Sequence, residues 1–245
     1  MSDYQIAGIC LHMVGTGEAL RCRMLAYETE NETADMVLVV NREELLASGK
    51  KYPNLSLDEW EYIRTGSAFG CRMPDFDGFC LHASAVVFKG KAVLFSGPCG
   101  IGKSTHTSLW QQYFGPERAV ILNDDKPVLR LIKDTFYACG TPWSGKSPLN
   151  RNQCIPLHAI VFLKQAGENK IRRLSVLEAV RLMVYQSMRP EKSRKLMEGL
   201  LNLIGTLLEK IPVYELECTV SFAAVELAYQ ELYHNEIQME GNDED

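Results

Sequence analysis

A glycine-rich segment at residues 97–105 constrains this chain more than any other feature of its sequence. It reads Gly97-Pro98-Cys99-Gly100-Ile101-Gly102-Lys103-Ser104-Thr105 and matches the Gly-x-x-x-x-Gly-Lys-Ser pattern, Walker A, at every fixed position. A short apolar run precedes it, and a run with helical character follows it. Glycines let the backbone curl so that successive N–H groups face one anion, and the following helix adds the positive end of its dipole. The segment therefore predicts a P-loop that binds the phosphates of a nucleoside triphosphate.

Two side chains of this segment have predicted roles. Lys103 supplies a mobile positive charge for the β- and γ-phosphates of ATP, and the hydroxyl of Ser104 is a ligand for Mg²⁺. Cys99, close to a helix start, is either a redox-sensitive thiol or a small loop residue. The alternative for the whole segment is a chance glycine-rich turn, and the four fixed positions with their correct flanks argue against it.

An acidic pair, Asp124 and Asp125, follows the apolar run of residues 119–122. Paired carboxylates at the carboxyl end of a strand near a phosphate loop suit two tasks. One aspartate holds Mg²⁺, and the other accepts a proton from the attacking hydroxyl. The sequence leaves open which aspartate does which, and the alternative is a solvated turn.

Two further features are weaker on their own. His82 stands just before a valine-rich strand, where a lone histidine is more often structural. The loop at residues 140–147 carries two glycines, hydroxyls and Lys146, and could present Lys146 and backbone N–H groups to a transferred phosphoryl group. Its alternative is an ordinary polar connection with a packed Trp143.

The arrangement of predicted elements is clearest in the middle of the chain. Residues 83–88 and 91–96 are strands separated only by Lys89-Gly90, so they must form an antiparallel hairpin. The front section is mixed, with a helix that starts after Ser56 and is soon interrupted by glycines, and its strands are expected to add to the main sheet. Other strands are predicted at residues 6–13, 36–40, 119–122, 128–132, 135–138, 158–163 and 213–218, and helices at 57–63, 104–114, 175–188, 192–210 and 221–234.

Composition restricts the class of partner and the compartment. The net charge of −5 argues against a broad nucleic-acid surface, and no apolar run approaches the roughly 20 residues that span a bilayer. The eight cysteines include no C-x-x-C pair, and the start lacks a secretory signal, so we expect free thiols in a cytoplasmic protein. A structural zinc site is the weaker alternative.

The order of these features resembles the superfamily of HPr kinase/phosphorylase and PEP carboxykinase. His82, a hairpin, the loop at 97–105, a helix and the Asp124-Asp125 pair follow one another, and residues 81–87 and 92–97 are similar to the PEP carboxykinase approach to its phosphate loop. The resemblance covers about residues 79–165. It implies an α/β fold with a PEP carboxykinase-like mixed sheet, as in the C-terminal domain of HPr kinase, a helical C-terminal section and self-association.

The resemblance also implies roles for single residues. His82 falls on a metal-binding or active-site histidine, residues 97–105 on the ATP phosphate loop, and Asp124 and Asp125 on the pair for metal binding and proton abstraction. Lys146 lies in the region of the HPr kinase signature, but the arginine-glycine-rich signature itself is not reproduced, so recognition of HPr and the reverse reaction are not implied. The chain is also less than half as long as a PEP carboxykinase.

We therefore expect residues 1–78 to form a mixed N-terminal section, residues 79–235 the kinase domain and residues 236–245 an acidic tail. The expected activity is ATP- and Mg²⁺-dependent phosphorylation of a hydroxyl, foremost serine or threonine of a protein or peptide. The open alternatives are a small-molecule kinase, a non-catalytic ATP-binding sensor and, last, a structural or interaction protein with a vestigial loop. Neither nucleic acid nor a membrane is expected as a partner.

Overall fold

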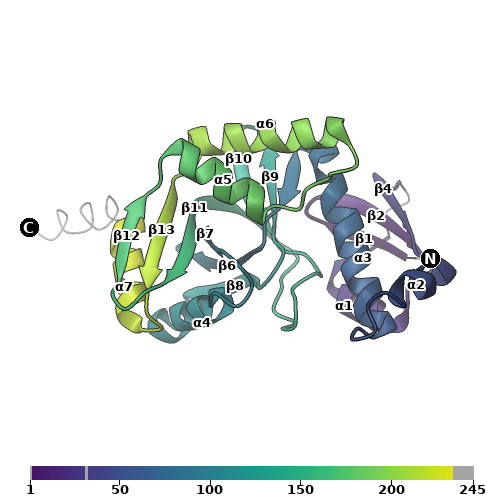
Figure 1. The fold of residues 1–245 in the computed structure, drawn as a ribbon, viewed down its shortest axis with the longest axis horizontal. Helices are drawn as coiled ribbons and strands as arrows, with labels where there is room; N and C mark the ends of the chain where they lie inside the picture. The colour runs from purple at the N-terminus through teal and green to yellow at the C-terminus, as the bar shows by residue number, and fades with distance from the viewer. Residues whose placement is uncertain (1, 31–32, 234–245) are drawn as a thin grey trace, which may run out of the picture.

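Two β-sheets of different size divide the chain, which has a mixed α/β fold (Figure 1). The structure, a computed structural model, describes residues 2–30 and 33–233. The acidic tail predicted at residues 236–245 lies outside the described residues. The smaller sheet belongs to the first 39 residues, and the larger one begins at Gly78. The N-terminal strands thus form a sheet of their own and are not added to the main sheet.

The small sheet has the strand order β3-β1-β2-β4. The strand predicted at residues 6–13 is in fact the second half of a hairpin, because Ala7 and Gly8 adopt positive φ values of 52° and 76° and reverse the chain. β4 pairs with β2 in parallel, at the end of the strand order. The bounds are β1 Ser2–Ile6, β2 Ile9–Val14, β3 Glu28–Thr29 and β4 Met36–Val39.

The helix predicted at residues 57–63 is much longer in the structure and is the longest helix of the N-terminal section. It begins at the predicted capping box of Ser56 and Glu59 and continues to Arg72 as α3 (Leu57–Arg72). Gly66 and Gly70 do not interrupt it, because they are the positions where a buried partner comes close. A Cβ on Gly66 would lie 2.6 Å from Cδ1 of Trp143, and one on Gly70 2.9 Å from Sγ of Cys80. The neighbouring helices are α1 Glu18–Met24, η1 Leu25–Tyr27, α2 Arg42–Gly49 and η2 Met73–Phe76.

The large sheet is mixed, as predicted, and contains the predicted hairpin of β6 (Ala83–Phe88) and β7 (Lys91–Ser96). Its order is β5-β9-β10-β11-β7-β6-β8, and β13 lies beside β11 and β12. β11 runs parallel to both β7 and β13, whereas the other pairs are antiparallel. The sequence did not reveal β5 and β12. The remaining bounds are β5 Gly78–Cys80, β8 Ala119–Asn123, β9 Val128–Ile132, β10 Thr135–Cys139, β11 Cys154–Gln165, β12 Lys170–Arg173 and β13 Val213–Cys218.

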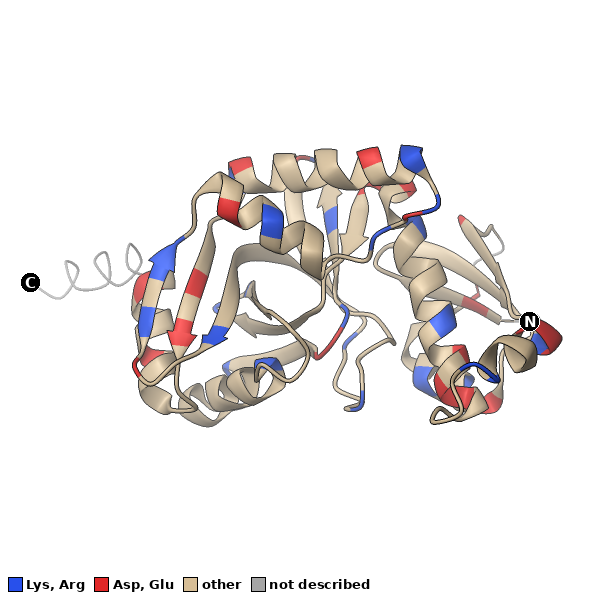
Figure 2. Cartoon of the chain, viewed as in Figure 1, with Lys and Arg blue, Asp and Glu red and all other residues tan. Residues whose placement is uncertain are grey.

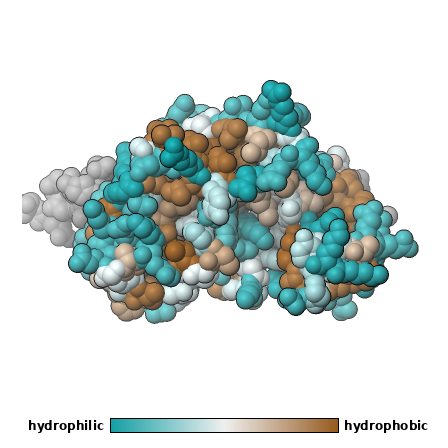
Figure 3. All heavy atoms as spheres, viewed as in Figure 1, coloured by the Kyte–Doolittle hydropathy of each residue, from teal (hydrophilic) through white to brown (hydrophobic). Residues whose placement is uncertain are grey.

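Helices cover both faces of this sheet (Figure 1). α4 (Lys103–Phe114) and α7 (Phe222–Leu232) share one apolar cluster with β6, β7 and β11 around Trp110 and Phe88. α5 (Val176–Gln186) and α6 (Arg194–Lys210) share a second cluster with the other face, around Leu200 and Phe162. Brown, hydrophobic surface gathers over α5 and α6 in Figure 3. Val176 and Leu177, at the start of α5, are exposed. Within residues 2–30 and 33–233, no helix is long and apolar enough to cross a membrane.

One cysteine pair corrects the expectation of free thiols. Cys139 and Cys154 are joined by a disulfide, whereas the other six cysteines are free. The pairing follows from the sheet, because Cys139 on β10 is directly opposite Cys154 on the antiparallel β11. Cysteines 15 positions apart carry no local spacing signal, so this pair became visible only with the strand register.

We expect Gly66→Ala to destabilise the protein by about 1–3 kcal/mol, because the new methyl group would overlap the buried indole of Trp143. Gly205→Ala on α6 is the matched control, since a Cβ there meets nothing within 4 Å. That change should stabilise the protein by about 0.5–1 kcal/mol through helix propensity. Urea unfolding of both variants measures the difference, and an equal gain in stability from both would contradict the close packing of α3 on Trp143.

Candidate functional site

The glycine-rich loop joins the end of β7 to the start of α4. Gly97, Gly100 and Gly102 have φ values of 145°, 80° and 108°, a region that only glycine enters readily. A Cβ on Gly100 or Gly102 would meet nothing within 4 Å, so both positions open toward free space. Gly102 is the N-cap of α4 and provides no side-chain cap, which leaves the first N–H groups of this helix for another acceptor.

Lys103 is only 7% exposed and is bound within its own loop. Its Nζ donates to the carbonyl oxygens of Gly97 and Pro98, each at 3.0 Å. Burial lowers the pKa of the Lys103 ammonium, and the negative charge of Asp125 opposes that shift. The side chain is thus a buried cation that neutral carbonyl groups solvate.

Asp124 is held rigidly at the end of β8. Its Oδ1 accepts a hydrogen bond of 2.9 Å from Ser84 Oγ on β6, and Ser84 in turn lies 2.8 Å from Oγ1 of Thr107 on α4. Its backbone N–H donates to Leu149 O at 3.1 Å. This carboxylate is nearly buried and is connected to the helix that follows the glycine-rich loop.

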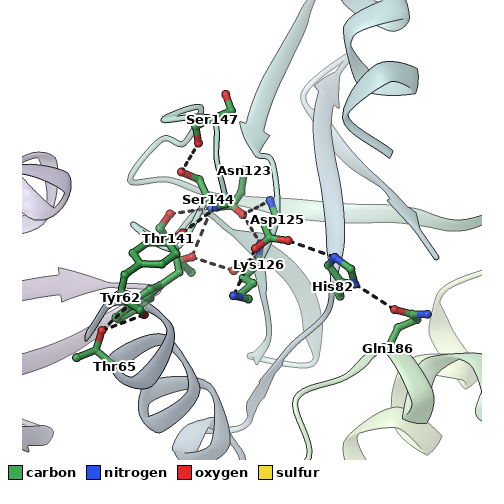
Figure 4. Close-up of polar contacts among 12 residues, drawn as sticks. Tyr62, Thr65, His82, Asn123, Asp125, Lys126, Thr141, Ser144, Ser147 and Gln186 are labelled. Carbon is green, nitrogen blue, oxygen red and sulfur yellow. Dashed lines mark hydrogen bonds and ion pairs between the residues drawn. The ribbon is translucent and has the colours of Figure 1, made fainter. Parts of the chain in front are cut away.

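Asp125 has different partners, although it is the next residue (Figure 4). Its Oδ1 lies 3.2 Å from Nε2 of His82, and its Oδ2 lies 3.4 Å from Nζ of Lys126. Burial raises the pKa of the Asp125 carboxyl, but the hydrogen bond from His82 and the charge of Lys126 outweigh burial, so the pKa is lowered. Asp125 is therefore a carboxylate at neutral pH.

The turn that carries Asp125 is fixed by Asn123. Asn123 Oδ1 accepts the backbone N–H groups of Asp125 at 3.2 Å and Lys126 at 2.8 Å, while its Nδ2 donates to Thr141 O at 2.7 Å. His82 is fixed from its other side, where Nδ1 lies 3.2 Å from Gln186 Oε1 at the end of α5 (Figure 4).

The N-terminal section holds the loop at residues 140–147 in place. Trp143 is buried, stacks on Phe69 of α3 at a centroid distance of 4.8 Å, and donates from Nε1 to Thr65 Oγ1 at 3.2 Å. The N–H of Gly145 donates to Tyr62 Oη at 2.7 Å, also on α3. Lys146, the predicted phosphoryl contact, is exposed at the tip of this loop.

One cavity of about 610 Å³ brings most of the predicted site residues together. The glycine-rich loop, the acidic pair, His82 and the 140–147 loop all contribute to its wall, whereas Gly97, Pro98 and Ile101 do not line it. Within the described part of the chain, no three His, Cys, Asp or Glu side chains cluster in a way that could hold a metal ion. The lining residues are His82, Cys99, Gly100, Gly102, Lys103, Ser104, Thr105, Asp124, Asp125, Ser144, Gly145, Lys146 and Ser147.

Several residues of the site were not predicted from the sequence. Lys126 directly follows the acidic pair, and this adjacency is a sequence signal that could have identified it as a charge partner of Asp125. Ser84 and Gln186 carry no local signal, because their importance comes only from contact with Asp124 and His82. Tyr62 lies 83 positions before the glycine whose N–H it accepts.

Comparison with known proteins identifies one family. The family model described as "ScmC: SynChlorMet cassette protein ScmC" matches residues 71–226, more than half of the chain. The solved structure of the Hpr(Ser) kinase/phosphatase from Coxiella burnetii is similar with a TM-score of 0.38 and 13% sequence identity, over 67% of this chain and 94% of that chain. None of the curated proteins matches this chain.

His106, inside α4, gives a testable dependence of stability on pH. Burial lowers its pKa to about 4, and its Nε2 accepts from Trp110 Nε1 at 3.3 Å. The folded protein keeps this ring neutral, whereas the unfolded chain takes up a proton below about pH 6.5. Stability is therefore lost as the pH falls from about 6.5 toward 4, by up to about 1.4 kcal/mol per pH unit. Between pH 7 and pH 5, the free energy of unfolding measured in urea should fall by about 1–2 kcal/mol less in His106→Gln than in the parent protein. Equal losses in the two proteins would contradict a neutral His106 in the fold.

Proposed function

The chain belongs to the family of the SynChlorMet cassette protein ScmC, and we propose that it is an ATP- and Mg²⁺-dependent kinase that phosphorylates a hydroxyl group. The observation that carries this proposal is a single cavity whose wall combines the glycine-rich loop with two differently bonded aspartates. Phosphoryl transfer needs little covalent chemistry from the protein, and it depends on positioning and on charge. The cavity provides groups for both.

The donors around the glycine-rich loop fit a triphosphate. Gly100 and Gly102 present backbone without side chains to free space, and the first turn of α4 is not capped by a side chain. Phosphate oxygens are better acceptors for a buried ammonium than the two carbonyl groups that Lys103 now contacts, because the bond then joins opposite charges. Residues 97–105 would therefore hold the phosphates, as in other loops of this pattern.

The donor set also fits a magnesium ion of the kind that kinases use. Mg²⁺ commonly takes only one or two protein carboxylates and completes its shell with phosphate oxygens and water, so a cluster of three acidic side chains is not needed. Ser104 and Asp124 are the residues that would hold it, since both line the cavity and Asp124 is fixed by Ser84. When bound, the ion would neutralise charge on the phosphates.

Asp125 is the better placed of the two aspartates for the proton of the acceptor. Its lowered pKa keeps it ionised, and His82 and Lys126 orient both of its oxygens. In the proposed step the acceptor hydroxyl oxygen bonds to the γ-phosphorus, the bond from that phosphorus to the bridging oxygen breaks, and ADP leaves. The hydroxyl proton goes to Asp125. His82, held by Gln186, is a positioning residue for this carboxylate.

The acceptor that we propose is a serine or threonine of a protein or peptide. Lys146 and Ser147 line the cavity on a loop that the N-terminal section holds in place. An acceptor polypeptide that contacts both the N-terminal section and the large sheet would therefore run past the cavity. A small-molecule acceptor predicts transfer to free metabolites, and a non-catalytic ATP sensor predicts binding without transfer. One assay separates the three, with labelled ATP, a peptide library and a metabolite mixture as acceptors.

We expect Lys103→Ala to weaken ATP binding by at least about tenfold, which is about 1.4 kcal/mol, because a charge-assisted contact to phosphate is lost. Lys170→Ala on the exposed β12 is the matched control and should bind as the parent does. Titration calorimetry with Mg²⁺ and ATP measures both. Unchanged binding by Lys103→Ala would remove the phosphate loop from the proposal.

Asp125→Asn should leave ATP binding within about threefold while transfer of the labelled phosphoryl group falls by about 10²–10⁴-fold, the usual contribution of a general base. Asn keeps the size of the side chain and removes its charge, so the fold is retained. Asp124→Asn should instead weaken Mg²⁺ binding, so that transfer requires a higher Mg²⁺ concentration. Transfer that persists in the double variant would exclude the proposed mechanism, and absence of transfer in the parent with tight ATP binding would favour a sensor.

A further inference from the structure

β4 leaves one edge of the small sheet open. Within the described residues it pairs with β2 alone. The N–H of Val40 donates to Val14 O at 2.8 Å, and backbone groups two residues apart point to the same side of a strand. The backbone groups of Val37 and Val39 therefore face away from β2. Arg72 confirms this direction, since its Nη1 donates to Val37 O at 3.0 Å, and a strand that pairs at Val37 would displace this side chain from that oxygen.

The side chains along this open edge are apolar, whereas unpaired edge strands usually carry charged residues or proline. Val37 is 48% exposed and Val39 is 70% exposed, and neither is a charged or proline residue of the kind that protects sheet edges. An extended peptide can add to such an edge through main-chain hydrogen bonds, while pockets beside the edge select its side chains.

Two pockets meet on α3, and the smaller one also reaches β4. The smaller one, of about 90 Å³, lies near the C-terminal end of β4. Its apolar wall is formed by Leu38, Val40 and Leu45, and its polar wall includes Asn41, Glu44, Glu61 and Thr65. The larger one, of about 470 Å³, lies between α3 and the segment that joins α5 to α6. Arg64 and Ala68 line both pockets, so together they form one groove along α3, which we call the α3 groove.

Charge selects the occupant of the larger pocket. Arg64, Arg72, Arg189 and Lys192 line it together with a single acidic residue, Glu191. Figure 2 shows Lys and Arg positions in blue on α3 and on the segment that joins α5 to α6. A second copy of the chain would bring the same basic pocket against itself, which like charges oppose. An acidic partner has the complementary charge.

We infer that β4 and the α3 groove bind an extended peptide segment that carries acidic residues and a small apolar side chain. The peptide adds as a fifth strand beside β4, and its apolar side chain enters the smaller pocket beside Leu38 and Leu45. Its acidic side chains face the larger pocket, which Arg72 connects to Val37 of β4. This inference deepens the proposed function, and it rests on that function only where it makes the bound segment part of the phosphoryl acceptor. α3 connects the two sites, since Tyr62 and Thr65 on this helix also hold the 140–147 loop.

The probe is a fluorescein-labelled twelve-residue peptide with an acidic half of alternating Glu and Thr and an apolar half of alternating Val and Thr. A second probe has the reversed sequence, because the edge admits either strand direction. A third carries N-methyl groups on alternate amides, which prevents strand pairing but keeps charge and composition. Fluorescence anisotropy without nucleotide measures binding, so the result does not depend on any phosphoryl transfer.

We expect one of the first two peptides to bind, its N-methylated form to bind at least about tenfold more weakly, and hydrogen exchange of the Val37 and Val39 amides to slow in the complex. Val39→Pro should also weaken binding at least about tenfold, because it removes an outward N–H that β2 does not use. Lys192→Glu should weaken it similarly, and the exposed Arg181→Glu, which makes the same charge change outside the groove, should not.

Several results would overturn the inference. These are no binding of either acidic peptide, equal binding of the N-methylated form, an equal loss in Lys192→Glu and Arg181→Glu, or protection of the β4 amides by self-association without peptide. Lys103→Ala should bind the peptide as the parent does. Peptide binding without phosphoryl transfer would therefore contradict the proposed function while the docking surface stands, and transfer without peptide binding would do the reverse.

Discussion

The antiparallel pairing of β6 with both of its neighbours determines where this chain can do chemistry. β7 runs into the glycine-rich loop, and β8 runs into the acidic pair. Because β6 is antiparallel to both, its first residues lie beside the ends of these two strands: Ala83 is opposite Ser96, and Ala85 is opposite Asn123. His82, the loop and the two aspartates therefore meet at one edge of the sheet, although up to 43 positions separate them in the sequence.

The local part of this arrangement could be predicted from the sequence. The strands of the hairpin, the glycine-rich loop and the capping boxes at Ser56 and Ser175 depend on residues a few positions apart, and the structure has them where the patterns place them. α3 was predicted too short because glycine in a helix usually signals its end. Here Gly66 and Gly70 make room for Trp143 and Cys80, and a pattern within one helix cannot reveal a partner far away in the chain.

The same limit applies to the site. The sequence indicated Asp124 and Asp125 but could not distinguish them, because their difference lies entirely in their partners. Ser84 connects Asp124 to α4, whereas His82 and Lys126 contact Asp125. The disulfide between Cys139 and Cys154 was missed for a related reason, since only the register of β10 and β11 places the two cysteines opposite each other. The disulfide closes the base of the loop whose tip carries Lys146.

The N-terminal section has a more direct relation to the cavity than a separate sheet suggests. Its helix α3 contacts the 140–147 loop through the indole of Trp143 and through the N–H of Gly145. Thr65, which accepts the hydrogen bond from Trp143, also lines the α3 groove. A buried indole that also makes a hydrogen bond leaves little freedom for the loop around it. The position of Ser144, Gly145 and Lys146 in the cavity wall thus depends on α3, and any ligand that moves α3 acts on the wall of the cavity as well.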